Sequence, residues 1–215
     1  MASQSRQPAD LGRSPLRDFL FAEFKMTNTQ RLTDFETSVR KTVSTNAGSI
    51  FLWDQNSFGS ITDYGSWAEQ LEDEPDIRAH IEAGRIVPVS WGGDSASEVV
   101  ARLGAPSRMS DREKQYLLVP SQPYRFKTTG KVCISGIEMI SGKPDDHVLT
   151  FEIPPGTYAV YLNMIAWMDE PGAENADGSP AANALPDFIV CLDRPNTELG
   201  YRIEPEPYRK EDAQR

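Results

Sequence analysis

Two runs of alternating apolar residues, 148–153 and 157–167, constrain this chain more than any other feature, and a Pro-Pro-Gly sequence at 154–156 separates them. Side chains two positions apart lie on the same face of a strand, so each run presents one apolar face. Proline and glycine favour a turn between the runs. The apolar faces are Leu149, Phe151 and Ile153 in the first run and Tyr158, Val160, Leu162 and Met164 in the second. The pattern predicts a β protein with a two-sided sheet.

Similar runs elsewhere extend this prediction to the whole fold. Further strands are expected at 35–43, 49–54, 85–91, 98–103, 116–119, 123–128, 131–140 and 185–192. The first two of these flank a turn and are expected to form a hairpin, and 123–128 can form another with 131–140 through Thr129-Gly130. About eight to ten short strands with frequent turns predict an all-β fold with minor helices, either an antiparallel β-sandwich or a jelly roll.

One short helical insertion is expected near 66–83. Ser66 and Glu69 have capping-box spacing, and Pro75 ends this helix and can begin a second one. Gly84 suits the left-handed position that follows a helix. Pro88 has no amide hydrogen to donate, so the strand expected at 85–91 is an edge strand or carries a bulge.

Three parts are expected along the chain. Residues 1–30 form an N-terminal extension, partly disordered or with a short helix that begins at Ser14-Pro15. Residues 31–203 form a single β-sandwich domain, and residues 204–215 form a charged tail. Met26 is an alternative start of translation, because the residues before it look appended.

The charge of the chain limits the classes of partner that it can bind. The 215 residues carry a net charge of −10, with a pI of about 4.7. Such a surface repels phosphates and anionic lipids, so we expect neither nucleic acid nor a membrane as partner, and a basic protein is favoured. Cys133 and Cys191 lie in apolar runs and are expected to be buried and reduced. A cytoplasmic location is expected, and the oligomeric state is left open.

Motifs for catalysis or cofactors are absent from the sequence. The two histidines, His80 and His147, and the two cysteines have no metal-ligand spacing, and there is no nucleophile elbow and no phosphate-binding glycine loop. We therefore expect no cofactor and no catalytic residues. Calcium binding by the acidic loop 169–184 stays open.

Tryptophans next to acidic residues are the best candidates for a binding surface. Trp53 and Trp91 each end an apolar strand, Trp67 lies at the start of the helix, and Trp167 precedes the acidic loop. Aromatic rings bury a large area at a small cost in entropy, and neighbouring acids attract a basic partner. The predicted partner-binding residues are Trp53, Asp54, Trp67, Glu69, Glu72, Asp73, Trp91, Asp94, Trp167, Asp169 and Glu170.

Four segments, spread over about residues 48–193, resemble an uncharacterised family of bacterial domains of unknown function. They are Phe-Leu-Trp-Asp at 51–54, Ala-Gly-Arg-Ile-Val-Pro-Val at 83–89 with Gly-Gly-Asp at 92–94, Phe-Glu-Ile-Pro-Pro-Gly-Thr-Tyr-Ala-Val at 151–160, and Leu-Pro-Asp-Phe-Ile-Val-Cys-Leu at 185–192. The Pro-Pro-Gly-Thr-Tyr turn is also similar to that of the competence-associated nuclease-inhibitor family. That resemblance implies a small acidic β-sandwich that occludes a basic nuclease.

Three functions remain open on this basis. The favoured one is an acidic binding module, of the immunity or inhibitor type, that neutralises a basic partner such as a nuclease toxin. The second is a hydrolase with a cleft lined by Trp53, Trp91 and Trp167 and carboxylates such as Asp54 and Asp94. The third is a carbohydrate-binding jelly roll that holds sugars against aromatic rings. The sequence favours a binding module over an enzyme.

Overall fold

The computed structural model describes residues 29–195 and 200–208. The expected N-terminal helix and the second start at Met26 lie outside these ranges. Within them the chain has eleven strands and three α-helices. The strands are β1 (Gln30–Arg31), β2 (Ser38–Thr45), β3 (Ser49–Asp54), β4 (Ile86–Trp91), β5 (Ser95–Leu103), β6 (Leu117–Pro120), β7 (Tyr124–Thr128), β8 (Lys131–Gly136), β9 (Leu149–Glu152), β10 (Gly156–Ile165) and β11 (Phe188–Asp193). The helices are α1 (Tyr64–Leu71), α2 (Glu74–Ala83) and α3 (Asp111–Gln115), with 3-10 turns η2 (Gln55–Phe58), η3 (Pro106–Arg108), η4 (Ile137–Met139) and η5 (Trp167–Asp169).

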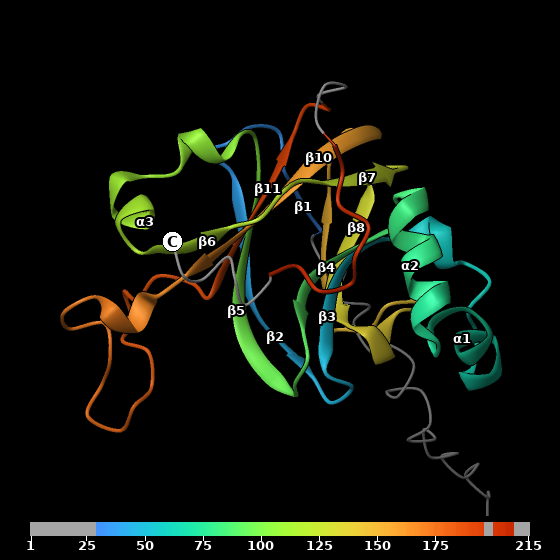
Figure 1. The fold of residues 1–215 in the computed structure, drawn as a ribbon, viewed down its shortest axis with the longest axis horizontal. Helices are drawn as coiled ribbons and strands as arrows, with labels where there is room; N and C mark the ends of the chain where they lie inside the picture. Colours follow the sequence, from blue (N-terminus) through green and yellow to red (C-terminus); the bar gives the residue numbers. More distant parts are fainter. Residues whose placement is uncertain (1–28, 196–199, 209–215) are drawn as a thin grey trace, which may run out of the picture.

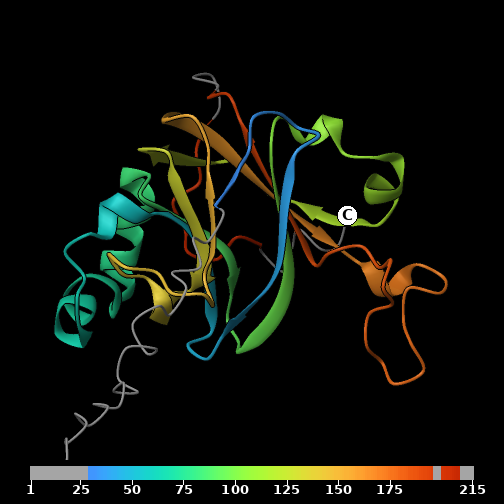
Figure 2. The same cartoon turned by 180° about the vertical axis from the view of Figure 1, so that it is seen from behind.

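The strands form two sheets, seen from one side in Figure 1 and from behind in Figure 2. The first sheet has the order β1-β9-β8-β3-β4. The second has the order β2-β5-β11-β10-β6, and β7 also pairs with β10. Strands β1 and β9 are parallel, as are β5 and β11. The expected antiparallel all-β fold is therefore corrected to a mostly β fold with two mixed sheets. Parallel partners need a long connection, and alternation along a strand carries no information about the direction of a distant neighbour.

The expected hairpins do not form. β2 pairs with β5 in the second sheet, whereas β3 pairs with β4 and β8 in the first. Likewise β7 pairs with β10 and β8 pairs with β3, so the turn at 129–130 also joins different sheets. The Pro-Pro-Gly turn does the same between β9 and β10. A turn that crosses between sheets keeps both apolar faces on one core, so the sequence pattern is the same as for a hairpin.

Side chains from both sheets share one hydrophobic core. It includes Leu52 and Ile134 from the first sheet and Val43, Val160 and Val190 from the second. The apolar faces predicted for 148–153 and 157–167 point into this core, since Phe151, Val160 and Leu162 are fully buried. The alternation along these strands therefore predicted their buried faces correctly.

A second buried cluster covers the other face of the second sheet. Ile189 and Cys191 of β11 reach it, and Phe35, Ile165 and Trp167 pack there with them. Because β11 is buried on both faces, its sequence is a nearly continuous apolar run. Both cysteines are buried free thiols, as predicted, and burial raises the pKa of each to about 12.

Helices α1 and α2 lie on the outside of the first sheet, beside β3, β4 and β8 (Figure 1). Phe58 of η2 links them to the sheet: its ring centroid lies 6.0 Å from that of Trp53 and 5.0 Å from that of His80 on α2. All six residues of β3, which lies between β4 and β8, are buried. In the described ranges no helix has the length and apolar character needed to cross a membrane.

The helical insertion expected near 66–83 is present, but it begins earlier. Asp63, not Ser66, is the N-cap of α1: its Oδ1 accepts a hydrogen bond from the Ser66 amide at 2.9 Å, and Ser66 Oγ accepts one from the Asp63 amide at 3.2 Å. The predicted Ser66–Glu69 capping box is therefore wrong, because Ser66 occupies the third helical position of an Asp63 cap. Gly84 ends α2 with φ of 77°, as predicted.

The prediction drawn from Pro88 is confirmed. β4 is an edge strand, and its pairing with β3 shifts register beside Pro88. α3 begins with a capping box formed by Ser110 and Glu113. The last described residues pack back on the sheets, since Tyr124 Oη donates to the Glu204 carbonyl at 2.9 Å and Tyr208 stacks on Phe188.

Candidate binding surface around α1

One face of α1 presents fixed aromatic rings. Tyr64, Trp67 and Leu71 follow each other at spacings of three and four residues, which places them on the same side of the helix. Trp67 is half-buried, and its Nε1 donates a hydrogen bond to the Ile137 carbonyl at 2.9 Å. The Tyr64 ring stacks on it with centroids 5.8 Å apart, although 71% of Tyr64 is exposed. The pair forms an oriented aromatic platform.

Trp67 lines two hollows, one toward the N-terminal end of α1 and one toward its C-terminal end. The first has a volume of about 350 Å³ and the second about 320 Å³. The first is lined by Ile61, Thr62, Asp63, Tyr64, Trp67, Glu138, Ile140 and Ser141. The second is lined by Ala47, Gly48, Ser49, Trp67, Leu71, Glu72, Ile77, Trp91, Gly92 and Ile137. Segments far apart in the sequence thus meet around one tryptophan.

The second hollow is bordered by two turns that are joined by hydrogen bonds. The amide of Gly92, after β4, donates to the Gly48 carbonyl at 2.9 Å, and the amide of Gly93 donates to the same oxygen at 3.1 Å. Gly92 has φ of 100°, a conformation that other residues rarely adopt. Trp91 is held edge-on against Phe51, with ring centroids 6.2 Å apart. The end of β4 therefore gives this hollow a rigid aromatic wall.

The carboxylate of Glu138 is held in place at the first hollow. Its Oε1 accepts from the Asn46 amide at 2.8 Å, and its Oε2 accepts from Thr45 Oγ1 at 3.0 Å. A Cβ at position 136 would clash with this carboxylate, so Gly136 lets it lie close against the end of β8. Each oxygen keeps a further lone pair for a ligand.

The segment 63–76 gives this surface its charge. It holds six acidic residues and no lysine or arginine. Among the residues that the structure describes, none of the ion pairs includes an acid of this segment. Hydrogen bonds from the Ser66 amide and hydroxyl lower the pKa of Asp63, so its carboxylate stays charged in mild acid. The acids of the segment are Asp63, Glu69, Glu72, Asp73, Glu74 and Asp76.

About half of the predicted partner-binding residues lie here. Trp67 and Trp91 line the hollows, together with Glu72, while Glu69 and Asp73 are exposed on and just after α1. Asp94 is exposed in the loop that follows Gly92 and Gly93. The structure therefore gathers Trp67, Glu69, Glu72, Asp73 and Trp91, from two parts of the chain, on or beside α1.

Trp53 and Asp54 lie elsewhere, in the core. Both are fully buried. Trp53 Nε1 donates to Ser135 Oγ at 3.0 Å. Asp54 Oδ1 accepts from Thr128 Oγ1 at 2.7 Å and from the Thr129 amide at 2.8 Å, and Oδ2 accepts from the Ser57 amide at 3.0 Å. These two residues hold the end of β3, and they do not line a cleft with Trp91 as the hydrolase hypothesis requires.

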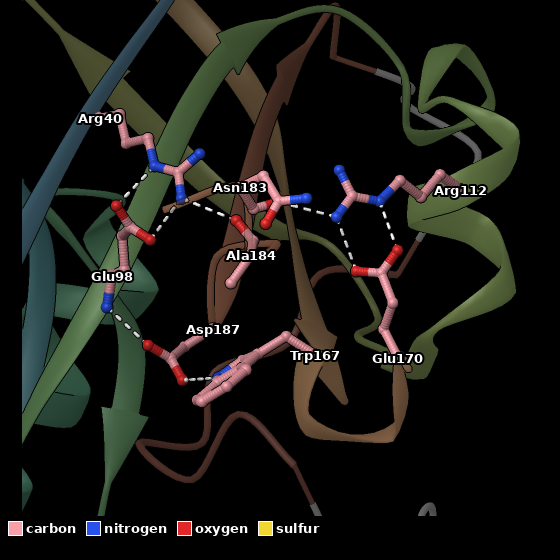
Figure 3. A network of polar contacts seen from close by, with 8 residues as sticks. All are labelled: Arg40, Glu98, Arg112, Trp167, Glu170, Asn183, Ala184 and Asp187. Carbon is pink, nitrogen blue, oxygen red and sulfur yellow. Dashed lines mark hydrogen bonds and ion pairs between the residues drawn. The ribbon is translucent and has the colours of Figure 1, made fainter. Parts of the chain in front are cut away.

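The turn η5 and the loop after it, which hold Trp167, Asp169 and Glu170, lie at the opposite end of the molecule from α1, outside the second sheet (Figure 1). Figure 3 shows that their loop is anchored there: Trp167 Nε1 donates to Asp187 at 2.8 Å, and Asp187 also accepts from the Glu98 amide. The contacts extend to two arginines. Arg40 binds Glu98 and the Ala184 carbonyl, and Arg112 binds both oxygens of Glu170 at 2.6 Å and the Asn183 carbonyl at 2.8 Å.

These contacts show a supporting role for Trp167 and Glu170, because their polar atoms are already bonded within the chain. Asp169 is exposed beside them. No three carboxylate, imidazole or thiol groups of the described residues come together as a metal site would need, the acidic loop 169–184 included.

Sequence reasoning missed two residues of the surface around α1. Tyr64 lies three positions before Trp67, so helical spacing could have identified it once the helix start was placed at Asp63. Glu138 reaches the surface through the pairing of β8 with β3, and nothing in its local sequence marks it.

The chain matches no family model and no curated protein. It is similar to two solved structures, each over 73% of this chain and 96% of the other. One is described as crocagin biosynthetic gene J, with 17% identity and a TM-score of 0.48. The other is ComJ from Bacillus subtilis, an inhibitor of the DNA degrading activity of NucA, with 13% identity and a TM-score of 0.41. The distant likeness to the competence-associated inhibitor is thereby shown, and at these scores no argument about function is drawn from it.

Proposed function

We propose that residues 31–203 form one β-sandwich domain that binds a basic protein, in the manner of an immunity or inhibitor protein, through the surface around α1. The observation that carries this proposal is the combination of an unneutralised acidic segment, 63–76, with the fixed rings of Trp67 and Trp91. Acidic residues speed the encounter with a basic partner, and rigid aromatic rings give the bound complex its energy.

The physical features of the surface favour a protein over other ligands. Its negative charge opposes the phosphates of nucleic acids. Its aromatic rings and hollows resemble the anchor sites that dominate protein interfaces, where a polar rim surrounds an apolar centre. The nuclease as partner rests on the resemblance of the turn at 154–158, and a cytoplasmic location is supported by the buried, unpaired thiols.

Charge reversal tests this proposal. The chain is used as bait in a native lysate, and captured proteins are identified by mass spectrometry. We expect the wild type to capture a basic protein and the variant Glu69→Lys, Glu72→Lys, Asp73→Lys to lose it, because the three exposed acids would then repel it.

The control is the variant Asp169→Lys, Glu174→Lys, Asp177→Lys, which changes the net charge equally at the opposite end of the molecule. It should capture the same protein as the wild type. Loss of capture by both variants, or by the control alone, would contradict the assignment of the surface around α1.

Carbohydrate binding is the second candidate. The exposed Tyr64 ring stacked on Trp67, with Asp63 and Glu138 beside it, has the aromatic face and hydrogen-bond acceptors that a sugar ring needs. Tryptophan fluorescence on a panel of glycans separates the two candidates, since only a carbohydrate-binding surface would respond.

A further inference from the structure

The two hollows beside Trp67 have the same chemical make-up. Each combines aromatic walls with at least one carboxylate. The first has Tyr64 and Trp67 with Asp63 and Glu138, and the second has Trp67 and Trp91 with Glu72. The remaining lining residues are neutral in both, so no cation of the chain occupies either hollow among the residues described.

We infer that each hollow takes one guanidinium group, so that the surface around α1 holds two arginine side chains of its partner, one on each side of Trp67. This inference rests on the proposed function and names the groups that the partner supplies. Because Trp67 lies between the two hollows, each hollow needs a side chain of its own.

A positive charge is the group that fits both parts of each hollow. The face of an indole or phenol ring carries partial negative charge and attracts a cation, most strongly on tryptophan. A carboxylate at the same site adds a charged acceptor. Glu138 and Glu72 accept hydrogen bonds from neutral groups of the chain, so an apolar side chain would leave their charges without a countercharge, and an anionic group would be repelled by them.

Arginine fits better than lysine. Its guanidinium is planar and weakly hydrated, so it can stack on Trp67 while its N–H groups bind a carboxylate in a fork. Glu138 is prepared for such a fork, because the Asn46 amide and Thr45 Oγ1 already fix both of its oxygens. The ammonium group of lysine is a compact, strongly hydrated charge that gains less from a ring.

Peptides test this inference without the natural partner. The probes are three capped peptides of equal length in which glycine alternates with arginine, lysine or citrulline. Binding is followed by the indole N–H signals of the four tryptophans in two-dimensional NMR. We expect the arginine peptide to shift the signals of Trp67 and Trp91 and to leave those of the buried Trp53 and Trp167 unchanged.

The affinities provide the decisive comparison. The citrulline peptide, which has the same shape without the charge, should bind about tenfold more weakly, and the lysine peptide should bind measurably more weakly than arginine. Glu138→Gln and Glu72→Gln should each weaken the arginine peptide. Glu82→Gln is the matched control, because Glu82 is exposed on the neighbouring helix α2 and lines neither hollow.

Equal binding of the three peptides, unchanged signals of Trp67 and Trp91, or an equal loss in Glu82→Gln and Glu138→Gln would overturn the inference. The capture experiment above has its own outcome. If charge reversal around α1 abolishes capture but the arginine peptide shows no preference, the proposed function stands and the arginine sites are rejected. If the charge-reversed variant captures the same protein as the wild type, the proposed function itself fails.

Discussion

At the scale of single residues, the two histidines of the chain differ in their exposure to solvent. His147 is exposed in a turn, whereas His80 is buried on α2 against Phe58. The Nδ1 atom of His80 is buried and has no hydrogen-bond partner among the described residues. Burial, and to a smaller extent the charge of Arg85, lower the pKa of His80 from 6.5 to about 4. His80 is therefore a neutral core residue at pH 7.

This burial makes the stability of the protein depend on pH. The unfolded chain binds a proton on His80 near pH 6.5, while the folded chain does so only near pH 4, so stability should fall as the pH drops between these values. We expect a loss of about 1–3 kcal/mol from this group. Urea unfolding at pH 7.5 and 4.5 measures it: His80→Leu should lose less stability on acidification than the wild type. His147→Gln should behave like the wild type, and an equal pH response in all three proteins would refute the prediction.

At the scale of elements, the loop 167–187 is held by arginines from two different places. Arg112 comes from α3 and Arg40 from β2, and each binds a carboxylate together with a carbonyl of the loop (Figure 3). The hydrogen bonds from Arg112 lower the pKa of Glu170, so the contact persists in mild acid. The sequence predicted a long polar loop here, and it could not show that distant arginines bind it.

Removal of Arg112 should free this loop without unfolding the protein. Arg112→Ala is expected to raise hydrogen exchange and proteolysis within 170–183, with little change in the melting temperature, because the Arg112 side chain is exposed to solvent. Arg108→Ala is the matched control, since its contact with Glu36 is 3.5 Å long and does not reach the loop. Equal protection of 170–183 in the wild type and Arg112→Ala would show that the pair does not hold the loop.

At the scale of the whole molecule, local patterns predicted strands, caps and buried faces, but not the partners of the strands. β3 has the bounds expected from the sequence, and Pro88 marks the expected edge. The pairing depends on contacts between distant segments, such as β5 with β11, which one sequence read alone does not reveal.

The same dependence on distant contacts explains why some predicted partner-binding residues lie on the surface and others lie in the core. Trp67 and Trp91 lie on a surface, while Trp53, at the end of a similar strand, lies in the core. The difference comes from Phe58 and α2, which cover Trp53, and from Thr128 and Thr129, which bind its neighbour Asp54. A tryptophan before a polar loop looks the same in both cases until the covering elements are placed.

Hydrogen exchange on the complex with the captured basic protein tests the central claim most directly, because it maps the bound surface without mutation. The account predicts slower exchange in 63–73 and in the turns around Gly48 and Gly92, with no change in 169–183. Protection confined to 169–183, or protection absent from α1, would contradict it.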